Sequence, residues 1–112
     1  MGTKRTKPEA NLGDVDALEF LRNLSGGPLT FARYLQSIRL GEEASQAEFA
    51  DQLGISKAHL CDIEKGRRAV SPQRAATFAE LLGYAPEQFV ELALQAEIDR
   101  AGLGYRVHLT AA

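Results

Sequence analysis

The chain has 112 residues, of which 45% are hydrophobic and 25% charged, and these values match one ordinary globular domain with short appendages. With one cysteine and two distant histidines, it is expected to form no internal disulfide and to bind no metal or other cofactor. No apolar run approaches the roughly 18 residues that span a bilayer, and no apolar signal segment follows the basic N-terminus. We therefore expect a soluble cytoplasmic protein without a membrane partner.

The first part of the chain is predicted to be an appendage. Residues 1–28 open with a polar, basic leader that we expect to be disordered. Asp14 or Asp16 can cap a short helix that ends near Leu24, before a Ser-Gly-Gly-Pro run at 25–28. The main domain is therefore expected to begin after this linker.

Cap residues divide the next region, 29–101, into five predicted helices. Thr30 can cap the first, and the run Ser45-Gln46-Ala47-Glu48 forms a capping box for the second. Ser56 can cap the third, Ser71-Pro72 starts the fourth, and the fifth runs from Pro86 to about residue 100. The residues expected to face the core are Phe31, Leu35, Ile38, Phe49, Ala50, Leu53, Leu60, Ile63, Ala75, Phe78, Ala79, Leu82, Phe89, Leu92, Ala93 and Ala96. The pattern predicts an all-α domain.

The period of the sequence changes at its C-terminal end. Apolar and polar residues alternate over 105–110, which predicts a short β-strand without a partner in the chain. The fifth helix also carries a second apolar row beyond its core stripe. We therefore predict that residues 102–112 are a dimerisation arm, whose strand pairs with a second copy; the alternative is that this tail folds back on its own domain or stays disordered. The residues assigned to dimerisation are Val90, Leu94, Ile98, Tyr105, Val107 and Leu109.

Charge is distributed unevenly along the chain, although the net charge is only −2 and the sequence pI is about 5.7. Residues 56–74 carry five basic side chains against two acidic ones, whereas residues 75–102 carry one against five. Salt screens charges beyond about 10 Å, so a local basic patch matters more to a phosphate backbone than the average charge does. An acidic protein can therefore still present one basic face.

The second and third predicted helices, 45–53 and 56–65, form a helix-turn-helix arrangement. Residues 45–66, SQAEFADQLGISKAHLCDIEKG, resemble the core motif of the phage-repressor and Cro-type helix-turn-helix family, also called the XRE family. With the flanking helices, the resemblance covers roughly residues 30–93. It implies a five-helix repressor-like domain that binds double-stranded DNA as a dimer.

One position departs from the family pattern. Glu43 stands where family members commonly have glycine, and Gly41 lies two places early. Because glycine readily takes a positive φ, the loop after the first helix is expected to differ in shape.

The outward face of the third helix is the predicted reading face, because Leu60 and Ile63 face the core. By resemblance, Lys57, Ala58 and Asp62 hold the positions at which family members contact base edges. Lysine can donate to guanine, alanine can touch a thymine methyl, and aspartate can accept from cytosine. The alternatives are that these residues form a solvated helix face, or that Asp62 pairs with a neighbouring cation.

Phosphate contacts are expected around that helix, from groups at helix starts and from basic side chains. The residues assigned to them are Gln46, Ser56, His59, Lys65, Arg67, Arg68, Ser71 and Arg74. The alternatives are that His59 packs internally and that Arg67 and Arg68 are solvated loop charges. Glu64 is expected to pair with Arg39, as the matching acid often does in the family. No catalytic residue is predicted, since His59 and Cys61 point to different sides of a helix.

These patterns predict a sequence-specific transcriptional regulator that binds a palindromic operator as a homodimer, or the antitoxin of a toxin–antitoxin pair with a toxin protein as partner. The antitoxin form is suggested by the extra segments at both ends of the chain. The alternative is a protein-interaction module that keeps the fold without binding DNA. Retention on nonspecific duplex at low salt separates the two.

Overall fold

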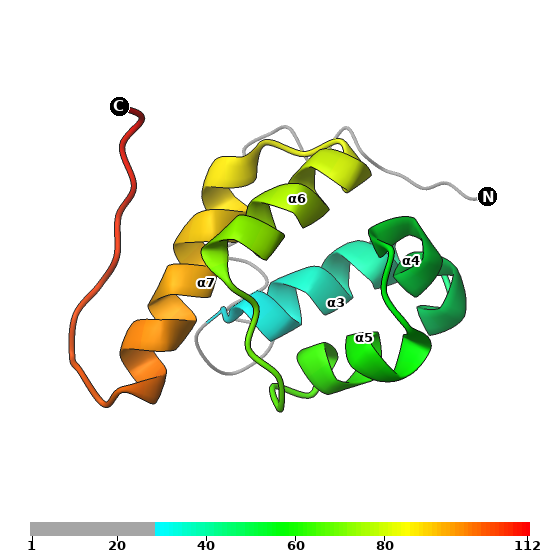
Figure 1. Ribbon diagram of the computed structural model, residues 1–112, viewed down its shortest axis with the longest axis horizontal. Coiled ribbons are helices and arrows are strands. Elements are labelled where there is room, and N and C mark those ends of the chain that lie inside the picture. The colour runs from blue at the N-terminus through cyan, green and yellow to red at the C-terminus, as the bar shows by residue number, and fades with distance from the viewer. Residues whose placement is uncertain (1–28) are drawn as a thin grey trace.

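The computed structural model describes residues 29–112, and within them five helices follow one another along the chain. They are α3 (Phe31–Gly41), α4 (Gln46–Leu53), α5 (Lys57–Glu64), α6 (Pro72–Leu82) and α7 (Pro86–Arg100). Figure 1 shows α3 in the middle, with α4 and α5 on one side and the packed pair α6 and α7 on the other. The all-α domain is therefore confirmed, while the leader, short helix and linker predicted for 1–28 lie outside the described residues.

Four of the five helices begin at the predicted cap. The side chains of Thr30, Ser45, Ser56 and Ser71 each accept a hydrogen bond from the backbone N–H three residues further on. The carboxylate of Glu48 accepts in return from the N–H of Ser45 at 2.9 Å, which completes the capping box. Local sequence therefore sets where these helices start, because each cap satisfies an amide that the helix leaves unpaired.

The loop between α3 and α4 contains the departure noted at Glu43. Glu43 itself adopts a positive φ of 57°, the conformation in which glycine was expected. Its N–H donates to the carbonyl of Leu40 at 3.0 Å, and the next amide, that of Ala44, donates to Arg39 at 3.1 Å. A residue with a Cβ costs roughly 1–2 kcal/mol in this region. Glu43 thus occupies a left-handed position that glycine would adopt without this strain.

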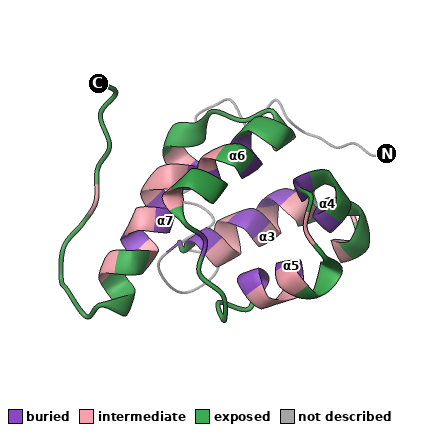
Figure 2. Ribbon diagram, viewed as in Figure 1, coloured by how far each residue is buried: buried purple, intermediate pink, exposed green. Residues whose placement is uncertain are grey.

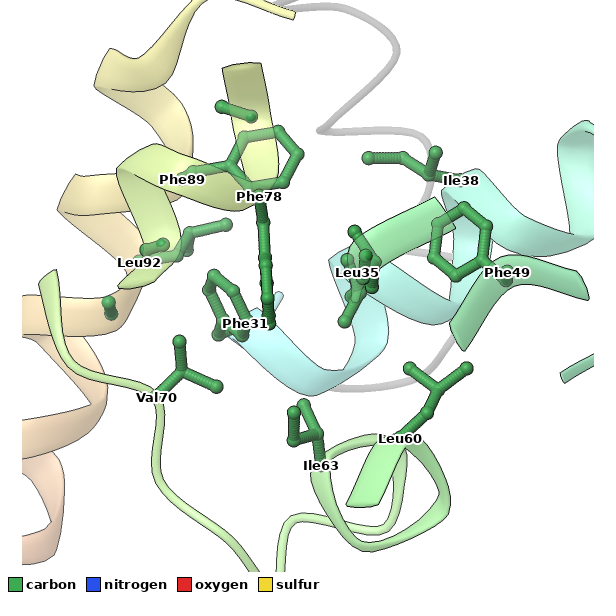
Figure 3. Packing of buried hydrophobic residues seen from close by; sticks show 14 of the residues in the cluster. Phe31, Leu35, Ile38, Phe49, Leu60, Ile63, Val70, Phe78, Phe89 and Leu92 are labelled. Atoms are coloured by element: carbon green, nitrogen blue, oxygen red, sulfur yellow. The ribbon is translucent and has the colours of Figure 1, made fainter. Parts of the chain in front are cut away.

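The core lies where the five helices meet, and the rings of Phe31, Phe49, Phe78 and Phe89 fill much of it (Figure 3). Of the residues expected to face the core, all are buried except Leu82 and Ala96, which are half-buried. Leu29 and Val70, in the segments before α3 and α6, are also buried. Each buried residue of this size contributes roughly 1.5–3 kcal/mol, so the cluster fixes α5 firmly against the other helices.

The strand predicted in the C-terminal tail (103–112) is absent from the structure, so that prediction is wrong. No strand is present anywhere in the described part of the chain, and the tail follows an extended path beside α7 (Figure 1). A lone extended segment has no ladder to join, and side chains of α7 bind its backbone instead. The amide of Gln95 donates to the carbonyl of Tyr105 at 2.8 Å and accepts from the N–H of Val107 at 2.7 Å. In this single chain the tail folds back on its own domain, which was the alternative to the strand.

The second apolar row of α7 is partly covered within the single chain. Val90, Leu94 and Ile98 are all half-buried in the described structure. Their assignment to dimerisation stays a prediction.

Candidate nucleic-acid interface

The tight turn between α4 and α5 positions α5 on the surface of the domain. Gly54 ends α4 in the left-handed conformation, with φ 73°, and the N–H of Ile55 donates to the carbonyl of Ala50 at 3.0 Å. Leu60 and Ile63 are fully buried on the inner face of α5. One side of α5 is therefore held in the core while its opposite side faces solvent.

The exposed side of α5 holds the predicted reading residues. Lys57 and Ala58, in the first turn, are exposed, and Asp62 one turn further on is half-buried. Figure 2 shows that α5 has both exposed and buried parts. Asp62 has a cation beside it, since the guanidinium of Arg67 lies 3.4 Å from its carboxylate. The backbone N–H of Arg67 also donates to the carbonyl of Asp62 at 2.9 Å. Asp62 therefore has the neighbouring cation that was considered for it. The same Arg67 side chain is the one predicted to contact a phosphate.

A basic cluster lies beside α5, where the loop after α5 and the start of α6 come together. A guanidinium nitrogen of Arg74 lies 3.5 Å from Nε2 of His59. Partial burial lowers the pKa of His59 below 6.5, and the charges of Arg68 and Arg74 lower it further, against an opposing effect of Asp62. The imidazole is therefore neutral at pH 7. The proximity of His59 and Arg74 could not be predicted from the sequence, because they lie 15 residues apart along the chain.

Glu64, at the end of α5, forms the predicted buried ion pair. Arg39 of α3 binds it in a bidentate manner through one edge of the guanidinium, with Nε donating to Oε2 at 2.7 Å and Nη2 donating to Oε1 at 3.0 Å. Only 2% of the glutamate side chain and 12% of the arginine side chain are exposed. The side-chain amide of Gln46 is a third donor to this carboxylate, bonding Oε1 at 3.0 Å. This bond could not be predicted from the sequence, and it ties the start of α4 to the end of α5.

The remaining predicted phosphate contacts are helix-start hydroxyls and surface cations. Ser56 and Ser71 accept from backbone amides as caps, which leaves each hydroxyl proton as a donor. Lys65 and Arg68 are exposed in the segment that follows α5. All four residues lie in the segment that runs from the start of α5 to the start of α6.

Residues 29–112 contain neither a membrane-spanning helix nor a cluster of metal-binding side chains. None of the helices there is long and apolar enough to cross a membrane. No group of three or more histidine, cysteine or acidic side chains in that range could hold a metal ion.

Two short capped helices, joined by a tight turn and braced by a third, define a helix-turn-helix protein. Comparison with known families agrees: the family described as "Helix-turn-helix domain" matches residues 30–92, more than half of the chain, and the protein belongs to this family. No curated protein and no solved structure matches the chain. Membership implies a DNA-binding regulator, and domains of this kind are typically not enzymes.

Proposed function

We propose that this protein is a transcription regulator that binds a palindromic DNA site as a dimer and reads bases with α5. The observation that carries the proposal is the exposed first turn of α5, with Lys57 and Ala58 turned to solvent, on a helix whose other face is locked into the core. The basic cluster next to it supplies the groups that hold a phosphate backbone. Repression of its own operon as an antitoxin is a narrower form of the same proposal.

The position of each residue relative to α5 suggests whether it contacts a base or a phosphate. Residues in the first turn of a recognition helix reach base edges, and basic groups at its sides contact phosphates. On this basis Lys57 donates to guanine and Ala58 contacts a thymine methyl, while Arg68 and Arg74 hold the backbone. In a dimer the two copies of α5 would lie about one DNA turn apart, roughly 34 Å.

The first experiment measures binding of the full chain to a nonspecific duplex at several salt concentrations. We expect retention at low salt that weakens as salt rises. No retention at low salt would contradict DNA binding and favour the protein-interaction alternative. An antitoxin role is tested separately: it requires a neighbouring reading frame whose product is toxic to cells and is neutralised when this chain is co-expressed.

The second experiment tests base reading. Selection from random duplexes gives the preferred site, and Lys57→Ala is then titrated against single-base variants of it. The expected loss is about 1–3 kcal/mol at the preferred site, with relaxed choice at one position per half-site. Glu80→Gln, at an exposed position of α6, is the control. An equal loss of affinity for every sequence would make Lys57 a phosphate contact.

A further inference from the structure

A cavity of about 330 Å³ lies where the start of α3, the segment between α5 and α6, and α7 meet. Much of its lining is apolar. The side chains of Phe31, Val70 and Leu92, which come from three different elements, lie near one another in Figure 3. An engineered cavity of about 150 Å³ already holds a benzene molecule, so this cavity has room for a larger organic ligand.

The charged groups at this cavity favour an anion. Two of the described residues that line it are cations, Arg68 and Arg100, and neither forms an ion pair with another described residue. The one acid among the described lining residues, Asp99, accepts a hydrogen bond from Gln95 at 2.9 Å. The first turn of α3 also reaches the cavity and contains no acidic residue. Apolar walls with two unpaired guanidinium groups match a ligand that has an apolar body and one carboxylate.

Arg68 connects this cavity to the proposed DNA interface. Its side chain is exposed in the segment after α5, and in the proposed function it holds the phosphate backbone. Partial burial and then the charge of Arg68 lower the pKa of His59, so this guanidinium acts electrostatically on a residue of α5. The same guanidinium donors cannot bind a ligand carboxylate and a DNA phosphate at one time. Occupation of the cavity and contact with DNA therefore compete for Arg68.

We propose that this cavity binds a small amphipathic carboxylate, with its apolar body against Phe31, Val70 and Leu92 and its charge bound by Arg68 and Arg100. The bound ligand withdraws Arg68 from the phosphate backbone and so weakens DNA binding. Ligand binding itself is independent of the proposed function, whereas its effect on DNA rests on that function. We refer to the cavity with these five residues as the carboxylate site.

Sodium decanoate is the probe, and decylammonium chloride is the matched amphiphile of opposite charge. Both are used below the concentrations at which they aggregate. Calorimetric titration of the full chain without DNA gives the dissociation constant of each. We expect decanoate to bind at least about tenfold more tightly than decylammonium, because the guanidinium groups repel an ammonium group. In NMR spectra of the backbone amides, decanoate should shift the lining residues Ala32, Ala69 and Ala96.

Two variants test the walls and the charge of the carboxylate site separately. Ala96→Leu puts a larger side chain into the cavity from its half-buried position on α7, and should weaken decanoate binding at least about tenfold. Arg100→Gln removes one cation and should weaken decanoate binding at least about threefold, and it decides the matter if Ala96→Leu does not fold. Lys65→Gln removes the same charge at an exposed position outside the described lining, and should bind decanoate as wild type does.

The effect on DNA is measured by titrating a duplex with and without saturating decanoate, at matched ionic strength. We expect decanoate to lower the duplex affinity of wild type at least about fivefold and to leave that of Ala96→Leu unchanged. Equal affinities for decanoate and decylammonium, amide shifts away from the cavity, or unchanged decanoate binding in a folded variant would overturn the carboxylate site. Duplex affinity that is unaffected by bound decanoate would overturn its link to Arg68. A chain that binds decanoate but no duplex would overturn the proposed function and leave the carboxylate site in place.

Discussion

The ion pair between Arg39 and Glu64 gives the sharpest stability prediction. Replacing Arg39 by methionine keeps much of the aliphatic stem but removes both bonds to Glu64 and a third, from Nη1 to the carbonyl of Ala44 at 3.1 Å. Glu64 is then left with Gln46 as its donor in a site where 2% of its side chain is exposed. Removing one partner of a buried pair costs about 3–5 kcal/mol. Because Gln46 remains, we expect Arg39→Met to cost about 3 kcal/mol.

Replacing both charged residues separates the free-energy contribution of the ion pair from that of the packing around it. In the double variant Arg39→Met with Glu64→Met, no charge is left buried, and apolar replacement of a buried pair is often close to neutral. We expect this variant to be about 2 kcal/mol more stable than Arg39→Met alone. Lys65→Met, an exposed neighbour of Glu64, is the matched control and should change stability by less than about 0.5 kcal/mol.

Urea unfolding followed by circular dichroism measures these free energies without the ionic screening that guanidinium chloride adds. The m-value should be unchanged across the variants, so that midpoints report stability alone. A cost below about 0.5 kcal/mol for Arg39→Met, or a double variant as unstable as the single one, would refute the reasoning. Either result would mean that Glu64 is hydrated rather than dependent on Arg39.

Three further predictions concern strain, phosphate contacts and pH. Glu43→Gly should stabilise the fold by about 0.5–1 kcal/mol in urea titrations, because relief of the positive φ exceeds the added freedom of the unfolded chain; a loss of stability would contradict this. Arg68→Ala should lower the slope of log K against log salt by about 0.9, and Arg67→Ala by less, because Arg67 is engaged with Asp62; equal slopes in the two variants would argue against that difference. Duplex affinity should rise as pH falls from 8 towards 5.5, and should do so less in His59→Gln. The lowered pKa keeps His59 neutral in the free protein, and a nearby phosphate favours its charged form; identical pH profiles would exclude His59 from the interface.

Those parts of the fold that depend on neighbours in sequence were predictable. The caps at Ser45, Ser56 and Ser71 act on amides three residues away, so the sequence shows both partners together. Core positions followed from helical spacing in the same way. Among the described apolar core residues, only Leu29 and Val70, which lie outside the helices where no period applies, were missed.

Contacts between segments distant in the sequence were harder to predict. The pair of Arg39 and Glu64 was found through the family resemblance, whereas the bond from Gln46 to Glu64 was not found at all. A signal for Gln95 did exist, because it is a polar residue three places after Leu92 on the inner face of α7. A polar side chain there needs internal partners, and in this protein the tail supplies them.

The placement of acids explains how a protein of net charge −2 can present a basic face. Both acidic residues of the 56–74 segment are engaged: Glu64 by Arg39 inside the domain and Asp62 by Arg67 at its surface. The cations that remain there without an acidic partner in the described structure are Lys57, Lys65, Arg68 and Arg74. Beyond this segment acids outnumber bases on α7, which carries four acidic residues against Arg100, and in residues 42–51, which carry four acidic residues and no basic one. Because screening limits each charge to about 10 Å, the salt dependence of DNA binding should follow these cations rather than the net charge.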